Sequence, residues 1–238
     1  MKKTVLFTVF LFAFSAFAIS DPMPSPCPSN IGANLQDYIN LGTTGCTEGN
    51  LLFSNFSLPN PQSVGVTVPT APSIGVTPWS NSDGSGIIFD AALAAGQNQS
   101  ADVVIDYVVR ANAGGAINDS SLSIDAGAFN GGVVSVDETQ CLGGLLPGCS
   151  GGTSISLNGS ANQLTDSNSF ADVTLVGISK DIQVSGGPNA NGQATVSSED
   201  QFFSTGTDAP EPASLLMFGT GMLGLAFVVR RKKAVCLK

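Results

Sequence analysis

Histidine is absent from the 238-residue chain, and its absence excludes several kinds of site. A Ser-His or Cys-His nucleophile pair cannot form, because the imidazole base that activates the nucleophile is missing. A zinc site without histidine needs four thiolates, and the sequence contains no Cys-x-x-Cys pair. We therefore expect no His-assisted catalytic site and no zinc site. Since the chain shows no other catalytic constellation, we expect that the protein is not an enzyme and has no catalytic or cofactor-binding residues, and calcium is the one metal ligand considered below.

Basic residues are scarce in the middle of the chain. All 18 acidic residues lie between Asp21 and Glu211, where only Arg110 and Lys180 are basic, so the net charge of this part is 2 − 18 = −16. This charge repels nucleic acid, so we expect no nucleic-acid partner. Lys180 is expected at an exposed strand position, as a solvated charge rather than as the base of a Ser-Lys pair.

The other basic residues flank two uncharged hydrophobic segments. Residues 1–18 have the pattern of a signal peptide, with Lys2 and Lys3 before an apolar run, and signal peptidase is expected to cleave after Ala18. Residues 213–229 carry no charge and would span roughly 25 Å as a helix, which is short but sufficient for a bilayer. We expect one transmembrane helix over residues 213–229 in the inner membrane and an exported domain over residues 19–209.

A basic cluster follows the second hydrophobic segment, and a proline-rich triplet precedes it. The cluster is Arg230, Arg231, Lys232 and Lys233, which favours the cytoplasmic side of the membrane. The triplet is Pro210, Glu211 and Pro212, whose prolines disfavour helix and should leave this site open to a protease. A plain stop-transfer anchor is the alternative interpretation, but it has no need of a carboxylate between two prolines.

This arrangement over residues 210–233 resembles the PEP-CTERM sorting signal of bacteria. The resemblance implies that exosortase, a membrane transpeptidase, cuts the protein at the signal and passes it towards the cell surface. The chain would then be anchored in the inner membrane before processing and lie at the cell surface or outside the cell afterwards.

Cysteine usage agrees with export. Cys27, Cys46, Cys141 and Cys149 lie in the exported part, where an oxidising compartment permits disulfides. Four cysteines allow three connectivities, and sequence proximity favours Cys27–Cys46 with Cys141–Cys149.

The exported part has the sequence pattern of a β protein, in which short runs of residues that favour β-strands alternate with turn-forming clusters of Gly, Pro, Asn, Ser and Asp. Residues 34–41 are expected to form a short helix. The pattern predicts a β-sandwich of jelly-roll or immunoglobulin-like type. The expected strands cover residues 51–58, 63–68, 74–79, 86–91, 101–111, 121–126, 132–138, 153–158, 170–184 with a bend at Gly177, and 194–197.

Three features suggest ligands. Residues 81–86 and 118–120 offer oxygen ligands for calcium on predicted turns, although ordinary β-turns have the same composition. Trp79 could stack on a sugar or fill the core. Asp102 and Asp106 share a strand face but lie about 13 Å apart, which is too far for paired-carboxylate catalysis, and Asp137 and Glu138 should point to opposite faces.

From the sequence we expect an exported structural or adhesive protein of the cell surface or extracellular matrix. The alternative is a calcium-dependent carbohydrate-binding module with an extracellular polysaccharide as its partner. A glycan hydrolase is the third hypothesis.

Overall fold

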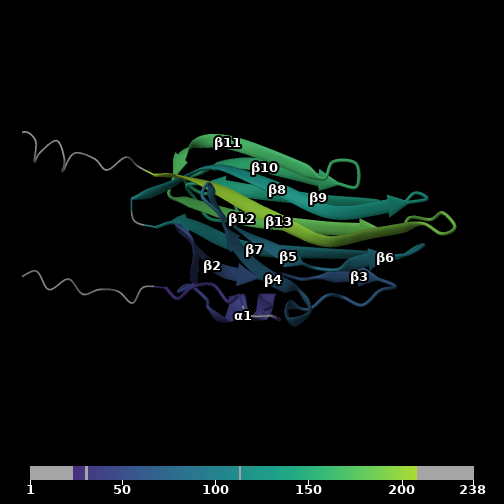
Figure 1. The fold of residues 1–238 in the computed structure, drawn as a ribbon. Coiled ribbons are helices and arrows are strands. Elements are labelled where there is room, and N and C mark those ends of the chain that lie inside the picture. The colour runs from purple at the N-terminus through teal and green to yellow at the C-terminus, as the bar shows by residue number, and fades with distance from the viewer. Residues whose placement is uncertain (1–23, 30–31, 113, 208–238) are drawn as a thin grey trace, which may run out of the picture.

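Two antiparallel β-sheets pack face to face in the computed structural model, which describes residues 24–29, 32–112 and 114–207 (Figure 1). The predicted β-sandwich is therefore confirmed. The predicted signal peptide and the hydrophobic segment 213–229 lie outside the described residues. Within the described part, no helix has the length and apolar character needed to cross a membrane.

Sheet A has seven strands. Its order is β1-β2-β7-β12-β9-β10, and β3 also pairs with β7. The strands are β1 (Cys46–Glu48), β2 (Leu51–Ser57), β3 (Gln62–Val64), β7 (Ser100–Ala111), β9 (Val133–Leu142), β10 (Thr153–Ser160) and β12 (Leu175–Ser185).

Sheet B has six strands. Its order is β11-β8-β13-β5-β4, and β6 also pairs with β13. The strands are β4 (Gly75–Ser80), β5 (Gly84–Asp90), β6 (Leu93–Ala95), β8 (Gly115–Phe129), β11 (Thr165–Val173) and β13 (Gln193–Thr207). The last strand, β13, lies between β8 on one side and β5 and β6 on the other, so it occupies the middle of the sheet.

The short helix α1 (Leu35–Asn40) confirms the predicted helix. Asn34 caps it with a reciprocal pair of hydrogen bonds, because its side chain accepts from the Gln36 amide and its own amide donates to Asp37. Leu35 and Tyr38 are buried against the sandwich. A one-turn 3₁₀ helix, η1 (Ala71–Ser73), precedes β4.

The core lies between the sheets and follows from alternation along each strand. On β7, Val103, Ile105 and Tyr107 are buried, while Asp102 and Asp106 face outward, as the period-two pattern predicted. Phe53 and Phe56 of β2 are also buried, as expected from the sequence. Stacked and tilted aromatic contacts join Phe56 to Tyr107 and Phe53 to Phe203.

The strand expected over residues 63–68 covers only Gln62–Val64, and the strand expected over residues 121–126 extends over Gly115–Phe129. Two further errors in strand extent affect the interior. Residues 170–184 are not one bent strand, because β11 ends at Val173 in sheet B and β12 begins at Leu175 in sheet A. A chain can switch sheets at such a corner without Gly or Pro, so the sequence does not reveal the switch.

The second error concerns β13, which was expected only over residues 194–197. A register shift between Val196 and Ser198 lets the strand continue to Thr207. The extra residue of such a bulge also moves the inward face from even to odd positions, so that Glu199 and Gln201 point into the core.

Candidate functional site

The predicted sorting signal lies just beyond the described domain. β13 ends at Thr207, so residues 210–212 and the basic cluster 230–233 follow the middle strand of sheet B and lie outside the described residues. Pro210, Glu211 and Pro212 therefore remain sequence-based predictions as site residues.

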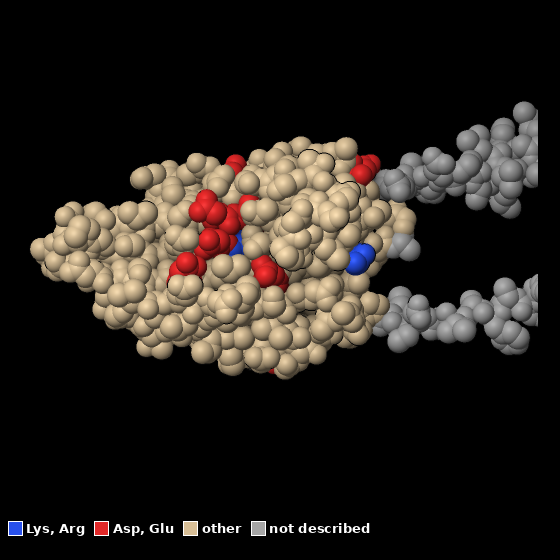
Figure 2. All heavy atoms as spheres, turned by 180° about the vertical axis from the view of Figure 1, so that it is seen from behind, with Lys and Arg blue, Asp and Glu red and all other residues tan. Residues whose placement is uncertain are grey.

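Acidic side chains gather on the outer face of the molecule seen in Figure 2. On the outer side of sheet A, Asp181 lies in register with Asp137 of the neighbouring strand, and Gln183 lies beside Asp102. Partial burial, and then the nearby Asp102 and Asp137, raise the pKa of Asp181, while a hydrogen bond from Gln183 lowers it. This face holds mutually repelling carboxylates.

A small hollow of about 190 Å³ adjoins these carboxylates, and its lining includes Ser100, Asp102, Ser135 and Gln183. Asp137 faces outward while Glu138 is buried, which confirms that the two point to opposite faces. Within the described residues, no group of three or more Asp, Glu, Cys or His side chains is arranged to hold a metal ion.

The two candidate calcium loops differ from expectation. Of residues 81–86, only 81–83 form the turn between β4 and β5, because Gly84, Ser85 and Gly86 already belong to β5. In this turn, Asn81 Oδ1 accepts hydrogen bonds from the amides of Asp83 and Gly84. Residues 118–120 are not a turn, because they lie inside β8. There Asp119 accepts from the Ser204 amide and Ser120 is fully buried.

Trp79 lies in an aromatic pair rather than in the core cluster. Its ring stacks on Phe202 with centroids 4.7 Å apart. Register places Gly86 of β5 between them, because Trp79 and Phe202 both pair with this glycine from opposite sides.

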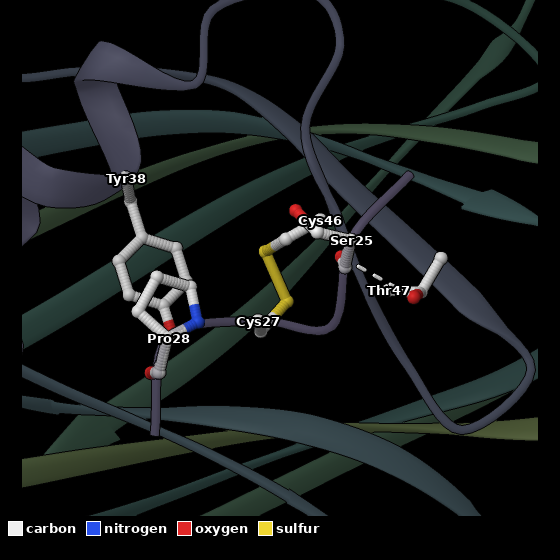
Figure 3. Close-up of a disulfide and its surroundings, with 6 residues drawn as sticks. All are labelled: Ser25, Cys27, Pro28, Tyr38, Cys46 and Thr47. Atoms are coloured by element: carbon white, nitrogen blue, oxygen red, sulfur yellow. Dashed lines mark hydrogen bonds between the residues drawn. A yellow bond between two sulfur atoms is a disulfide. The ribbon is translucent and has the colours of Figure 1, made fainter. Parts of the chain in front are cut away.

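Both predicted disulfides are present. Cys27 and Cys46 have Cα atoms 4.7 Å apart, and Cys141 and Cys149 have Cα atoms 5.2 Å apart. Figure 3 shows the first bridge joining the N-terminal lead-in to the start of β1. Backbone hydrogen bonds beside it connect Cys27 and Ser25 to Thr47, and Tyr38 donates to the Pro28 carbonyl oxygen.

The principal polar cluster of the described residues lies between the sheets. The prediction that Lys180 is exposed is wrong, because this residue is completely buried, with its Nζ 2.5 Å from Oε2 of the equally buried Glu138. The two face each other directly on neighbouring strands, β12 and β9. Since an isolated charge is very costly to bury, these two charges stabilise each other in the interior.

The cluster continues across the sandwich. Lys180 Nζ donates to Oε1 of Gln201 on β13, at 3.1 Å. In the other direction, Gln140 Nε2 donates to Glu138 Oε1, and Ser120 Oγ donates to Gln140 Oε1 at 2.8 Å. Hydrogen bonds from both sheets thus meet at one buried ion pair.

Several atoms of this cluster have no partner. The unpaired atoms are both carboxyl oxygens of Glu199, the Nε2 of Gln201 and the hydroxyl of Tyr107. Burial raises the pKa of Glu199 to about 8, against a smaller lowering by Lys180. At neutral pH Glu199 is therefore mostly protonated, and the Lys180–Glu138–Glu199 group has no net charge.

Strand alternation carried a signal for this cluster that the sequence-based prediction missed. Lys180 has the same parity on β12 as the buried Ile178 and Ile182, and Glu138 has the parity of Val134 and Val136 on β9. Polar residues at core-facing positions of a strand are candidates for an interior network. Glu199 and Gln201 carried no such signal, because the bulge in β13 changes the parity.

The domain defined by these observations is a disulfide-bonded all-β sandwich with a buried ionic cluster. Residues 208–232 match the family model of the PEP-CTERM protein-sorting motif. The chain is therefore a protein with a PEP-CTERM sorting motif, as its sequence predicted, and the motif implies export and membrane-anchored processing before release at the surface.

The sequence matches no curated protein. Among solved structures, the chain is similar to TmCBM61 in complex with β-1,4-galactotriose, with 10% identity, 61% of this chain and 90% of that chain covered, and a TM-score of 0.28. It is also similar to a Glycosylation Associate Protein (Gap123) complex from Streptococcus agalactiae, with 8% identity, coverage of 60% and 24%, and a TM-score of 0.26. A third is the tailspike protein 4 of bacteriophage CBA120, with 11% identity, coverage of 62% and 19%, and a TM-score of 0.25. Likeness at these TM-scores says nothing about the function of this chain.

Proposed function

We propose that residues 19–209 form a structural or adhesive domain that exosortase delivers to the cell surface or extracellular matrix, and that this domain acts on no external substrate. The observation that carries the proposal is the placement of the sorting motif directly after β13. When a surface protein is held through its C-terminal end, mechanical force on the protein passes through its last strand. Here that strand is paired along both edges in the middle of a sheet.

The buried cluster supports the same role. Its ionisable side chains, Lys180, Glu138 and Glu199, are fully buried between the sheets, so they are placed to hold the two layers together rather than to meet a dissolved substrate. Two disulfides add cross-links that survive in an oxidising exterior.

The delivery step is tested by expressing the full chain in hosts with and without exosortase and following its size and location. The wild type should become shorter and reach the surface only when exosortase is present. Glu211→Ala should remain unprocessed in both hosts, whereas Asp125→Asn, which changes an exposed carboxylate on β8, should be processed like the wild type. A wild-type protein that stays full-length in the inner membrane of both hosts would contradict the proposal.

The second candidate function is glycan binding on the outer face of sheet A. Its specific support is the polar hollow beside Asp102, where hydroxyl, amide and carboxylate groups could accept and donate hydrogen bonds to a sugar. Calorimetry with surface polysaccharides, with and without calcium, tests it. Binding heat in the wild type that is lost in Gln183→Ala would favour glycan binding at this hollow. If the wild type gave no heat with or without calcium, only the structural role would remain.

A further inference from the structure

A lysine and a glutamine from opposite sheets meet inside the sandwich, and their hydrogen bond uses only the oxygen of the glutamine amide. Lys180 Nζ lies 3.1 Å from Gln201 Oε1, so the amine is adjacent to the carbonyl group of the amide. The other half of that amide, Nε2, is buried without a hydrogen-bond partner. A carboxylate oxygen of Glu138 lies 2.5 Å from the same Nζ.

We propose that Lys180 and Gln201 react with each other after folding to form an isopeptide bond that joins β12 of sheet A to β13 of sheet B. The groups needed for this amide exchange are present in the cluster: an amine, an acceptor carbonyl, and a carboxylate in contact with the amine. No cofactor, oxidant or second protein enters the reaction.

The reaction exchanges the primary amide of Gln201 for a secondary amide and releases ammonia. Lys180 first transfers a proton from Nζ to Glu138, which leaves a neutral amine and a neutral carboxyl group. The Nζ lone pair then attacks Cδ of Gln201, and the new N–C bond gives a tetrahedral intermediate. Glu138 donates its proton to Nε2 while it takes a second proton from Nζ, the Cδ–Nε2 bond breaks, and ammonia leaves. The products are a secondary amide, one molecule of ammonia and a protonated Glu138.

The surroundings favour this reaction. Before it, the interior contains a buried ammonium, a buried carboxylate and an unpaired amide nitrogen, each of which costs free energy. Afterwards all three are gone, because the product amide and Glu138 are neutral and the unpaired nitrogen has left as ammonia. Groups held in contact by a fold also react with effective concentrations that reach about 10⁵ M or more.

Glu199 supplies an acid on the same side of β13. It lies two residues before Gln201, and both side chains face the core. With its pKa raised to about 8 by burial, Glu199 keeps its proton at neutral pH and can donate to the oxygen that becomes negative in the tetrahedral intermediate. We therefore assign Glu138 to proton transfer and Glu199 to stabilisation of the oxyanion.

The bond would change how the domain carries load. It would link two residues with a sequence separation of 21 and tie β13, which leads into the sorting motif, to the opposite sheet. Force applied through the C-terminal end would then meet a covalent link before the core could separate.

The test is mass spectrometry of the full chain, purified from its host, denatured and with its disulfides reduced. After proteolysis, the peptides that contain residues 180 and 201 should appear as one linked species whose mass is lower than their sum by one ammonia. Recovery of both peptides free and unmodified overturns the proposal. A link from Lys180 to Glu138 with loss of water also overturns it, because Gln201 would not be the acceptor.

Variants separate the roles of the three groups. Lys180→Arg and Gln201→Met should show no linked peptide, whereas Gln193→Met, which replaces an exposed glutamine on β13, should be linked like the wild type. Glu138→Gln keeps the amine and the acceptor, and linkage should slow by about 100-fold or more without the proton-transferring carboxylate. A folded Glu138→Gln protein that links as fast as the wild type would remove Glu138 from the reaction. The wild-type measurement decides the proposal even if a variant fails to fold.

Discussion

The Lys180 ammonium and the Glu138 carboxylate face each other on adjacent strands, and neither is exposed to solvent. Such a pair gives little net stability compared with apolar residues, but removal of one partner leaves an uncompensated charge in the interior. The energetic importance of this contact therefore appears when only one of the two residues is changed.

Relative to the unlinked Lys180–Glu138 ion pair, Lys180→Met should lower the free energy of unfolding by about 3–5 kcal/mol, because Glu138 is then buried without its cation. The double variant Lys180→Met/Glu138→Gln should lose less, since no charge remains unpaired. Both variants lack the lysine, so their difference isolates the charge, and denaturant unfolding measures it. Arg110→Met, at an exposed position, serves as the control and should change stability by about 0.5 kcal/mol or less. Equal losses in the single and double variants would contradict the prediction.

The pH dependence of stability should contain a contribution from Glu199. Its pKa rises from 4.5 to about 8 on folding, so the folded state holds a proton that the unfolded state releases between these values. The contribution is fully present below pH 4.5 and is lost as the pH rises through about 8, because the unfolded state then binds fewer protons than the folded state.

Glu199→Gln has no ionisable group at this position and should show a flatter profile over that pH range. Urea unfolding of both proteins at several pH values measures the difference, with Asp125→Asn as the exposed control. If the unfolding free energies of the wild type and Glu199→Gln changed in parallel with pH, the pKa of Glu199 would not be raised by folding.

The two disulfides should contribute unequally, because they close loops of different length. On the chain-entropy model, loss of Cys27–Cys46, with a separation of 19, costs about 3 kcal/mol, and loss of Cys141–Cys149, with a separation of 8, costs about 2.5 kcal/mol. Paired Cys→Ser variants measured under oxidising conditions provide the comparison. Reducing agent should bring the wild type to the stability of the variant that lacks both bridges, and a wild type insensitive to reduction would contradict this.

Asp181→Asn should stabilise the protein slightly at neutral pH. Burial and the neighbouring Asp102 and Asp137 disfavour the Asp181 carboxylate, whereas an Asn side chain still offers an oxygen to Gln183. Because the site is partly exposed, the gain should be no more than about 1 kcal/mol and should shrink in high salt. Thermal unfolding at low and high salt measures it, and a destabilised variant would show that repulsion is not the controlling effect on this face.

The sequence by itself determined the features that depend on local composition and order. Polar and apolar residues alternate along the chain, so the β-sandwich and the faces of β7 could be read from it. The sorting motif is also readable, because it consists of contiguous residues, and the short separations between cysteines correctly indicated both disulfides.

Only the tertiary structure decided the interior cluster. Lys180, Glu138 and Gln201 come from three strands in two sheets, and their meeting depends on the pairing of β12 with β9 and on the packing of sheet A against sheet B. The bulge after Val196 turns Glu199 and Gln201 inward, and the switch of sheets at Thr174 brings β12 beside β7 and β9. Both depend on contacts between residues distant in sequence, because neither residue type nor spacing specifies where a strand shifts its register or leaves its sheet.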